Sequence, residues 1–294
     1  MTVIFGMTWR EMTRKRVVLL TLLLTVVFLI AFWFIARTIA TAGITAGLDP
    51  DSPELLIERF TRGAFLLTLG YFFGAFVVAF LAIFTSFSAI AGEAEQGVLQ
   101  AMLPRPLPRW QWYLGRWLGY VTMGILYAFL LYAAIFLITW QHAAVPRDAA
   151  SLFQAFLLFA MPVPILAAVS MLGSGWLSAL GNGVWMTMLY GAGWLGGMIE
   201  KVGAQLPLGT DVIQPLSKVS GLISLLMPVD GLQRKMLAVL FDYRSLGALL
   251  PVGANPMNQF AFGQVPSTSF VVYAGLYGAA ALGLGMWRFS RKDF

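Results

Sequence analysis

The sequence predicts an all-α integral membrane protein with six transmembrane helices, and three observations lead to that fold class. Of its 294 residues, 59% are hydrophobic and only 11% are charged, whereas charged residues make up about a quarter of a soluble domain. Six charge-free runs are close in length to the roughly 20 apolar residues that a helix needs to cross a bilayer. The basic residues flank these runs, as they do in membrane proteins.

The predicted spans follow the charge-free runs and together form a single transmembrane domain over residues 1–294. The first run is longer than the apolar part of a cleaved signal peptide and no small-residue cleavage site closes it, so it stays as a span. Pro162 and Pro164 predict a kink in the fourth run, and Gly181, Asn182 and Gly183 predict a tight turn between the fourth and the fifth. The six runs are residues 17–36, 64–91, 118–140, 152–180, 181–199 and 269–287.

Charge placement predicts that both chain ends lie in the cytoplasm. With the N-terminus inside, the cytoplasmic side holds ten of the 19 Lys and Arg residues on about half the loop length of the other side. We therefore expect a multi-pass protein of the cytoplasmic (inner) membrane, with its net charge of +6 facing the cytoplasm. Because the basic residues are explained as topology signals, nucleic acid is not an expected partner.

The residue inventory excludes several kinds of chemistry. The chain has no cysteine and one histidine, His142, which excludes disulfides, thiolate chemistry and a histidine-cluster metal site. No Asp, Glu, Lys, Arg or His lies within a predicted span, which disfavours a proton or cation pathway built by the spans themselves. We expect no catalytic residues and no metal or other cofactor bound by this chain.

Residues 1–16 are predicted to form an amphipathic helix in the cytoplasmic interface of the membrane. Phe5, Trp9, Met12 and Arg16 recur at helical spacing, and most of the charged residues lie elsewhere around the helix. Two interpretations stay open: a simple basic cap, or an elbow helix that also contacts a cytoplasmic partner.

The cytoplasmic loop at residues 92–117 is predicted to contain another short helix. Glu93 and Glu95 lie in its first turn, where they favour the positive end of the helix dipole. Three prolines then predict a stiff, extended exit, after which Arg109 and Arg116 would pin the start of the third span at headgroup level. The apolar face of the helix consists of Val98, Leu99, Met102 and Leu103.

Residues 200–268 are predicted to form a long outer loop with short extracytoplasmic helices between spans five and six. An apolar stripe predicts the first helix, and Asp230 with Gln233 resembles a capping box that opens a second helix through Phe241. Neither apolar run reaches spanning length, so we expect interfacial or re-entrant helices that cover the outer mouth, or a purely structural cap. The stripe consists of Val212, Leu216, Val219, Ile223 and Leu226.

Aromatic and methionine side chains mark a candidate substrate path. Phe72, Phe76 and Phe80 recur every four residues along the second span, and Trp185 and Met188 share a face of the fifth. Methionine is an adaptable lining for varied ligands. These faces would suit a hydrophobic or amphipathic substrate, and the alternative is that they are surfaces for lipid or for helix packing.

The cytoplasmic loop and the order of elements resemble the permease subunits of the type-2 ABC exporter family. In that family the pattern E-x-E-x-G-T-L, followed by P-x-x-R and G-K, occupies the loop between spans two and three. The chain departs from the pattern at Val98, where the family usually has Thr, and at Arg116, where it usually has Lys. The residues that match are Glu93, Glu95, Gly97, Leu99, Pro106, Arg109 and Gly115.

The resemblance implies that residues 93–102 form a coupling helix that docks on a separate ATP-binding subunit. The chain has no G-x-x-x-x-G-K-[ST] phosphate loop, so ATP, Mg²⁺ and ATP hydrolysis are expected in that partner, and this chain is expected to be no enzyme. The resemblance further implies two ATP-binding subunits, a second permease copy (identical or related), and export as the direction. The candidate coupling residues are Glu93, Glu95, Gln96, Gly97, Leu99, Met102, Arg105 and Arg109.

Two other classes of function stay open. A secondary transporter needs two related halves and broken helices, and only Pro162 with Pro164 seriously interrupts a span. A membrane-embedded lipid-modifying enzyme needs paired carboxylates or a nucleophile with a base, and Glu93 with Glu95 is the only close pair. Their spacing of two places them on different sides of a helix, which disfavours joint action on one substrate.

Overall fold

The computed structural model describes residues 2–41, 53–97, 108–146, 148–203, 210–241 and 265–291. Within these ranges every regular element is an α-helix, which agrees with the predicted fold class. The helices are α1 (Thr2–Arg14), α2 (Arg16–Thr41), α3 (Pro53–Ser86), α4 (Ala91–Glu95), α6 (Arg109–His142), α7 (Ala149–Ala160), α8 (Pro162–Ser174), α9 (Ala179–Gly203), α10 (Thr210–Leu226), α11 (Val229–Leu240) and α13 (Thr268–Arg291).

Five helical stretches in the described residues are long and apolar enough to cross a membrane. They correspond to five of the six predicted spans: Arg16–Thr41, Glu58–Glu95, Arg109–His142, Ala149–Ser174 and Thr268–Arg291. The remaining predicted span, residues 181–199, lies in α9, which is long enough at 25 residues but less apolar, because its glycines, Asn182 and Glu200 dilute its aliphatic side chains. The total of six spans therefore stays a prediction.

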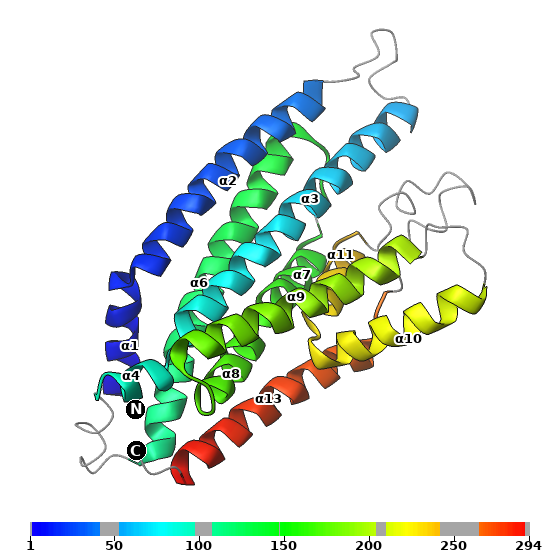
Figure 1. Cartoon of the computed structure of the whole chain (residues 1–294). Helices are drawn as coiled ribbons and strands as arrows, with labels where there is room; N and C mark the ends of the chain where they lie inside the picture. The colour runs from blue at the N-terminus through cyan, green and yellow to red at the C-terminus, as the bar shows by residue number, and fades with distance from the viewer. Residues whose placement is uncertain are drawn as a thin grey trace.

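The chain ends and α4 lie together at one end of an elongated helical bundle (Figure 1). The start of α6 and the C-terminal end of α13 lie there as well. Because charge placement predicts that this end faces the cytoplasm, we refer to it as the cytoplasmic end. The core of the bundle lies between α3, α6 and α8, where Tyr71, Leu131 and Leu166 are almost completely buried. By contrast, α2 packs with few of its side chains and leaves most of its apolar surface exposed, as a helix bordering lipid does.

The fourth predicted span is kinked where the prolines predicted it. Met161 separates α7 from α8, and Pro162 occupies the first helical position of α8, where its missing N–H is not needed. The predicted turn at 181–183 is wrong, because the chain turns at residues 175–178 instead. The Oγ of Ser178 accepts a hydrogen bond from the N–H of Gly181 at 3.2 Å, which caps α9 and draws residues 181–183 into its first turns.

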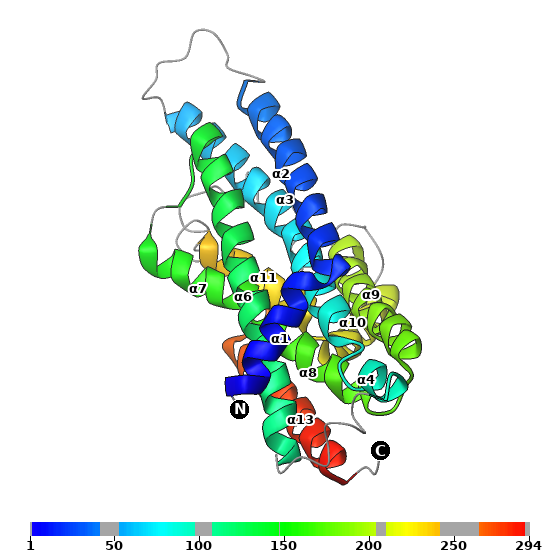
Figure 2. The ribbon, with the colours of Figure 1, turned by 90° about the vertical axis from the view of Figure 1, so that its left-hand side faces the viewer.

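The N-terminal helix α1 lies across α6 (Figure 2). Its buried residues are Ile4, Thr8 and Met12, so of the predicted face of Phe5, Trp9, Met12 and Arg16 only Met12 packs into the protein. The interfacial placement of that face stays a prediction. Thr8 approaches Gly119 of α6 so closely that a Cβ on Gly119 would lie 2.6 Å from Thr8 Cγ2. The contact with α6, which no local pattern records, therefore decides which side of α1 is buried.

The third span begins earlier than predicted. Helix α6 starts at Arg109, so residues 109–117 are helical rather than part of the cytoplasmic loop. Pro108 precedes the helix and cannot donate a backbone hydrogen bond, so it fits a position just before the first turn. The structure places Arg116 two turns inside α6.

Helix α10 turns several of its apolar residues outward. Val219 and Leu226 of the predicted stripe are 50% and 55% exposed, whereas Ser220 and Ser224 are buried. Ser220 Oγ donates a hydrogen bond to the carbonyl of Gly196 on α9 at 2.7 Å. Ile223 of the same stripe packs against Gly196 of α9, so only part of the stripe faces away from the protein, as expected in lipid, where hydroxyl groups rather than apolar ones need protein partners.

Helix α11 lies inside the bundle against α7 and α9 (Figure 1). Nine of its 12 residues are buried, so it is an interior element of the bundle, and whether it is re-entrant or interfacial with respect to the membrane stays a prediction. The predicted capping box is wrong: Pro228 is the N-cap and makes no side-chain capping bond. Asp230 instead pairs with Arg234, one turn further along α11.

Candidate functional site

The cytoplasmic end of the bundle is held together around α4. Ser174, the last residue of α8, accepts hydrogen bonds at Oγ from the backbone N–H groups of Ile90 and Ala91 at 3.1 and 2.9 Å. At the other end of α4, Glu95 Oε1 accepts from the N–H of Ala179, the first residue of α9, at 2.9 Å. Both interactions satisfy N–H groups at helix starts, which have no partner within their own helix. Helix α4 is therefore tied to α8 and α9 at both of its ends.

Asn182 reinforces this connection from inside the bundle. Its side chain is completely buried, and Nδ2 donates to the carbonyls of Phe87 and Ser170 at 2.7 and 2.8 Å. Phe87 lies in the turn between α3 and α4, Ser170 lies on α8, and Asn182 itself lies on α9. One amide group thus joins α8 and α9 to the turn that leads into α4.

Four charged side chains, which we call the ionic cluster, connect α4 to α1 and α6. They are Glu11, Lys15, Glu93 and Arg116. Arg116 forms ion pairs with both Glu11 and Glu93, and Lys15 Nζ lies 3.0 Å from Glu11 Oε1. The side chain of Arg116 is only 7% exposed, and a buried guanidinium is tolerated because both neighbouring carboxylates neutralise it.

The two cations of the ionic cluster favour the charged form of Glu11. Burial raises the pKa of Glu11, but Arg116 and Lys15 outweigh that effect, so the pKa lies below its usual value of 4.5. Arg116 also lies over the ring of Trp112, with its Cζ 5.4 Å from the ring centroid, which holds the guanidinium in place. The cluster therefore acts as a fixed link between the three elements.

The structure brings four of the predicted coupling residues together. Glu93 and Glu95 lie on α4, Gln96 is its C-cap, and Gly97 follows. Gly97 has a φ of +71°, the left-handed conformation that ends helices, so the predicted continuous helix over 93–102 is wrong at this point. Arg109 contacts a backbone carbonyl near the end of α13 instead. Leu99, Met102 and Arg105 lie outside the described residues.

Sequence reasoning missed Glu11 as a site residue and misplaced Arg116. The sequence predicted Arg116 as a membrane anchor at headgroup level, whereas the structure buries it in the ionic cluster. The one indication of a site role in the sequence was that Arg116 lies at the basic position of the family's loop pattern. Its partner Glu11 lies 105 residues away in the chain, a separation at which no helical spacing reveals a contact.

The predicted phenylalanine stripe packs against α9. The ring centroid of Phe76 lies 5.4 Å from that of Trp194 and 5.7 Å from that of Tyr190. Phe80 lies 6.0 Å from Tyr190, and Phe72 lies 6.4 Å from Trp194. In this conformation the stripe is a helix contact, which was the alternative interpretation of the pattern.

Trp185 and Met188 do not join that contact. Trp185 is 38% exposed and its ring lies beside Gly173 of α8, whereas Met188 is 70% exposed on the outward surface of α9. A substrate path lined by all five predicted residues would need either a movement of α9 against α3 or a surface from a second copy. The path stays a prediction.

A buried ion pair on α11 is a feature that the sequence did not predict. Asp230 Oδ2 lies 3.0 Å from Arg234 Nε, and the two side chains are 3% and 4% exposed. A Cβ on Gly197 of α9 would collide with the Asp230 carboxylate, so the missing side chain of this glycine leaves the space that the carboxylate fills. Gln233 Nε2 reaches the carbonyl of Tyr71 at 3.4 Å. The interior of the bundle thus contains an acidic and a basic side chain, although the predicted spans themselves contain none.

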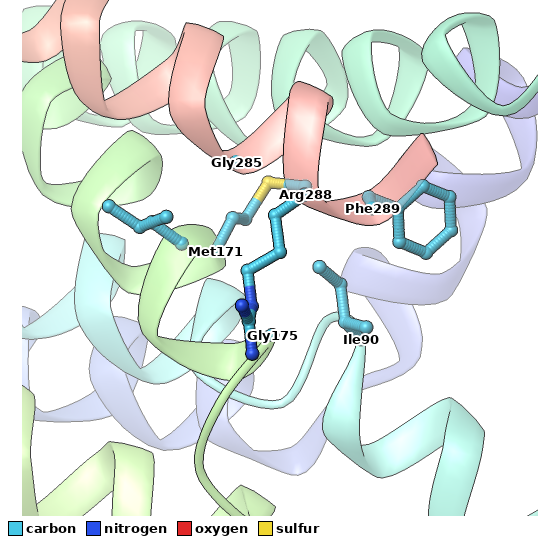
Figure 3. Close-up of a pocket in the computed structure, with 7 residues that line it drawn as sticks. Ile90, Met171, Gly175, Gly285, Arg288 and Phe289 are labelled. Carbon is cyan, nitrogen blue, oxygen red and sulfur yellow. The ribbon is translucent and has the colours of Figure 1, made fainter. Parts of the chain in front are cut away.

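A small pocket lies between α8, α13 and the turn before α4 (Figure 3). Figure 3 shows Arg288 extending from α13 toward Gly175 at the end of α8, with Ile90 and Met171 on the pocket walls. The guanidinium of Arg288 also lies over the ring of Trp176, 5.0 Å from its centroid. This contact attaches the end of α13 to the same turn that holds α4.

Comparison with known families agrees with this architecture. The family model described as ABC-2 family transporter protein matches residues 3–294, which is nearly the whole chain. None of the curated proteins compared with the chain matches it. Both the apolar helices and the family match indicate a multi-pass membrane protein that is a component of a transporter. The chain therefore belongs to the ABC-2 family of transporter proteins.

Proposed function

We propose that this chain is the membrane-spanning subunit of an ATP-driven exporter, moved by a separate ATP-binding subunit that docks on α4. ATP and Mg²⁺ would be bound and ATP hydrolysed in that partner, because this chain contains no phosphate-binding loop. Two such subunits and a second permease copy, identical or related, would complete the complex. The cytoplasmic (inner) membrane is its expected location.

The attachment of α4 is the observation that carries this proposal. Through Ser174 and Glu95, α4 is bonded to α8 and α9, and through Glu93 and Arg116 it is linked to α6 and α1. A five-residue helix has almost no hydrophobic face of its own, so its position depends on these polar contacts. A force applied to α4 would therefore move several helices together, which is the rigid-body change that alternating access requires.

The substrate class follows from the aromatic surfaces of α3 and α9. If α9 moves away from α3, it exposes Phe72, Phe76 and Phe80, which now contact Tyr190 and Trp194. Such a surface would bind a hydrophobic or amphipathic molecule.

Co-purification and ATPase measurements test the proposal. Gln96 is exposed beside α4, and Gln141 is exposed at the opposite end of α6, so the two glutamines provide a matched pair. We expect the wild-type chain and the Gln141→Trp variant to retain an ATP-binding subunit and its activity after purification in mild detergent. Gln96→Trp should lose both. Purification of the wild-type chain without any nucleotide-binding partner would refute the proposal.

One observation favours secondary transport as a second candidate function. The Asp230–Arg234 pair is buried among helices, and buried carboxylates serve as ion-coupling sites in secondary transporters. In that case transport would continue after ATP is depleted while a proton or sodium gradient is maintained. Loss of transport on ATP depletion with the gradient intact would exclude it.

A further inference from the structure

The groove between α1, α4 and α6 carries an excess of positive charge. It has a volume of about 640 Å³, and four basic and two acidic side chains are among those that line it. Lys15 and Arg116 are engaged by Glu11 and Glu93 in the ionic cluster. The two remaining cations are therefore the source of the excess.

Arg10 and Arg14 supply this charge. They lie one turn apart on α1, both are exposed, and both line the groove. Neither makes an ion pair within the part of the chain that the structure describes. Two guanidinium groups at that spacing can each donate paired hydrogen bonds to phosphate oxygens, for which arginine is better suited than lysine.

The apolar surface beside the groove identifies the kind of phosphate. Val3 and Met7 of α1 are 72% and 48% exposed, although α1 is otherwise rich in polar residues. Helix α2 begins at Arg16, and Leu19 and Leu20, a turn later, are 68% and 59% exposed. The charged groove therefore opens directly next to a helix surface that suits acyl chains.

We infer that this groove binds the phosphate group of an anionic lipid of the cytoplasmic leaflet, with Arg10 and Arg14 as its ligands and the acyl chains along α2. The bound lipid would hold α1 against the ionic cluster and so against α4. A soluble phosphate compound shares the headgroup chemistry but lacks the chains. The inference does not depend on an ATP-binding partner.

Binding of dioleoyl phosphatidylglycerol to the purified full chain tests the inference, with native mass spectrometry and thermal unfolding as readouts. We expect phosphatidylglycerol to bind and raise the unfolding temperature, whereas phosphatidylcholine does neither. Arg10→Gln with Arg14→Gln should weaken phosphatidylglycerol binding about thirtyfold, from a factor of about five for each basic side chain near the surface. Restoring the charge with Arg10→Lys and Arg14→Lys should recover most of the affinity.

The control removes the same charge elsewhere on the cytoplasmic end. Arg288→Gln with Arg291→Gln changes two basic residues of α13 that lie outside the groove, and should leave phosphatidylglycerol binding within about twofold of wild type, since surface charges act locally. Equal losses in both double variants, or unchanged binding in the Arg10 and Arg14 variant, would overturn the inference. Millimolar inorganic phosphate that stabilises the chain as well as the lipid does would overturn the lipid as the ligand. The inference would also be overturned if an acidic protein co-purified with the wild-type chain but not with the Arg10 and Arg14 variant, while lipid binding stayed the same in both.

Discussion

The buried pair Asp230–Arg234 allows the sharpest stability prediction. Because the two side chains are 3% and 4% exposed, removing one takes away the opposite charge that lies beside the other in the interior of the bundle. Arg234→Met or Asp230→Leu alone should lower the free energy of unfolding by about 3–5 kcal/mol. The double variant replaces both charges by apolar groups and should lie close to wild type or above it, since such replacements are often neutral or stabilising by about 1–4 kcal/mol.

The exposed pair Glu58–Arg62 on α3 provides the comparison. It has the same i,i+4 spacing, but its side chains are 41% and 19% exposed. Glu58→Gln should therefore lower the free energy of unfolding by less than about 1 kcal/mol. The two pairs differ mainly in burial. The difference between their losses in free energy of unfolding therefore isolates the effect of removing a charge from water.

Unfolding in detergent, induced by sodium dodecyl sulfate and followed by tryptophan fluorescence, measures the four variants in one cycle. The interaction energy between positions 230 and 234 should be about 3 kcal/mol or more. Additive effects of the two single changes would refute the conclusion that the pair is buried and mutually neutralised. Single changes of less than about 1 kcal/mol would refute it as well.

Three further predictions concern the cytoplasmic end. Asn182→Ala removes both hydrogen bonds of the buried amide and should lower the free energy of unfolding by about 1–3 kcal/mol for each carbonyl left without a partner, measured by the same titration. Gly119→Val places atoms against Thr8 and should cost about 1–3 kcal/mol, whereas Gly6→Ala, which meets open space, should not destabilise; similar melting temperatures for both would contradict the packing of α1 on α6. Because the folded-state pKa of Glu11 lies below 4.5, its contribution to stability is present above that pH and is lost as the pH falls through the lowered pKa. Glu11→Gln should reduce the fall in melting temperature below pH 4.5, and an unchanged pH profile would argue against the ion pairs of Glu11.

Sequence patterns predicted the fold well where burial in lipid decides the structure. Charge-free runs located five stretches of helix that can cross a membrane, and Pro162 located the break between α7 and α8. The sequence patterns failed where a single polar side chain determines the position of a turn. Ser178 caps α9, so the turn lies at residues 175–178. The glycines on both sides of Asn182 predicted the turn at residues 181–183 and gave no indication that the helix would start before them.

The candidate site could be predicted only in part, because its contacts join distant segments. The loop motif marked Glu93 and Glu95, which the structure places together on α4, but it could not show that Arg116 lies between Glu93 and Glu11. The interior position of α11 was missed for a similar reason. A short amphipathic segment with an Asp and an Arg indicates an exposed helix, unless something shows that the two charges neutralise each other inside the bundle.

Cross-linking at α4 tests the central claim, that an ATP-binding subunit docks there. The chain contains no cysteine, so Gln96→Cys and Gln141→Cys each introduce its only thiol, at exposed positions at the end of α4 and at the C-terminal end of α6, respectively. A short thiol-to-amine cross-linker applied to native membranes should join the Gln96→Cys chain to an ATP-binding subunit and leave the Gln141→Cys chain free of it. No adduct at position 96, or the same adduct at both positions, would contradict the account.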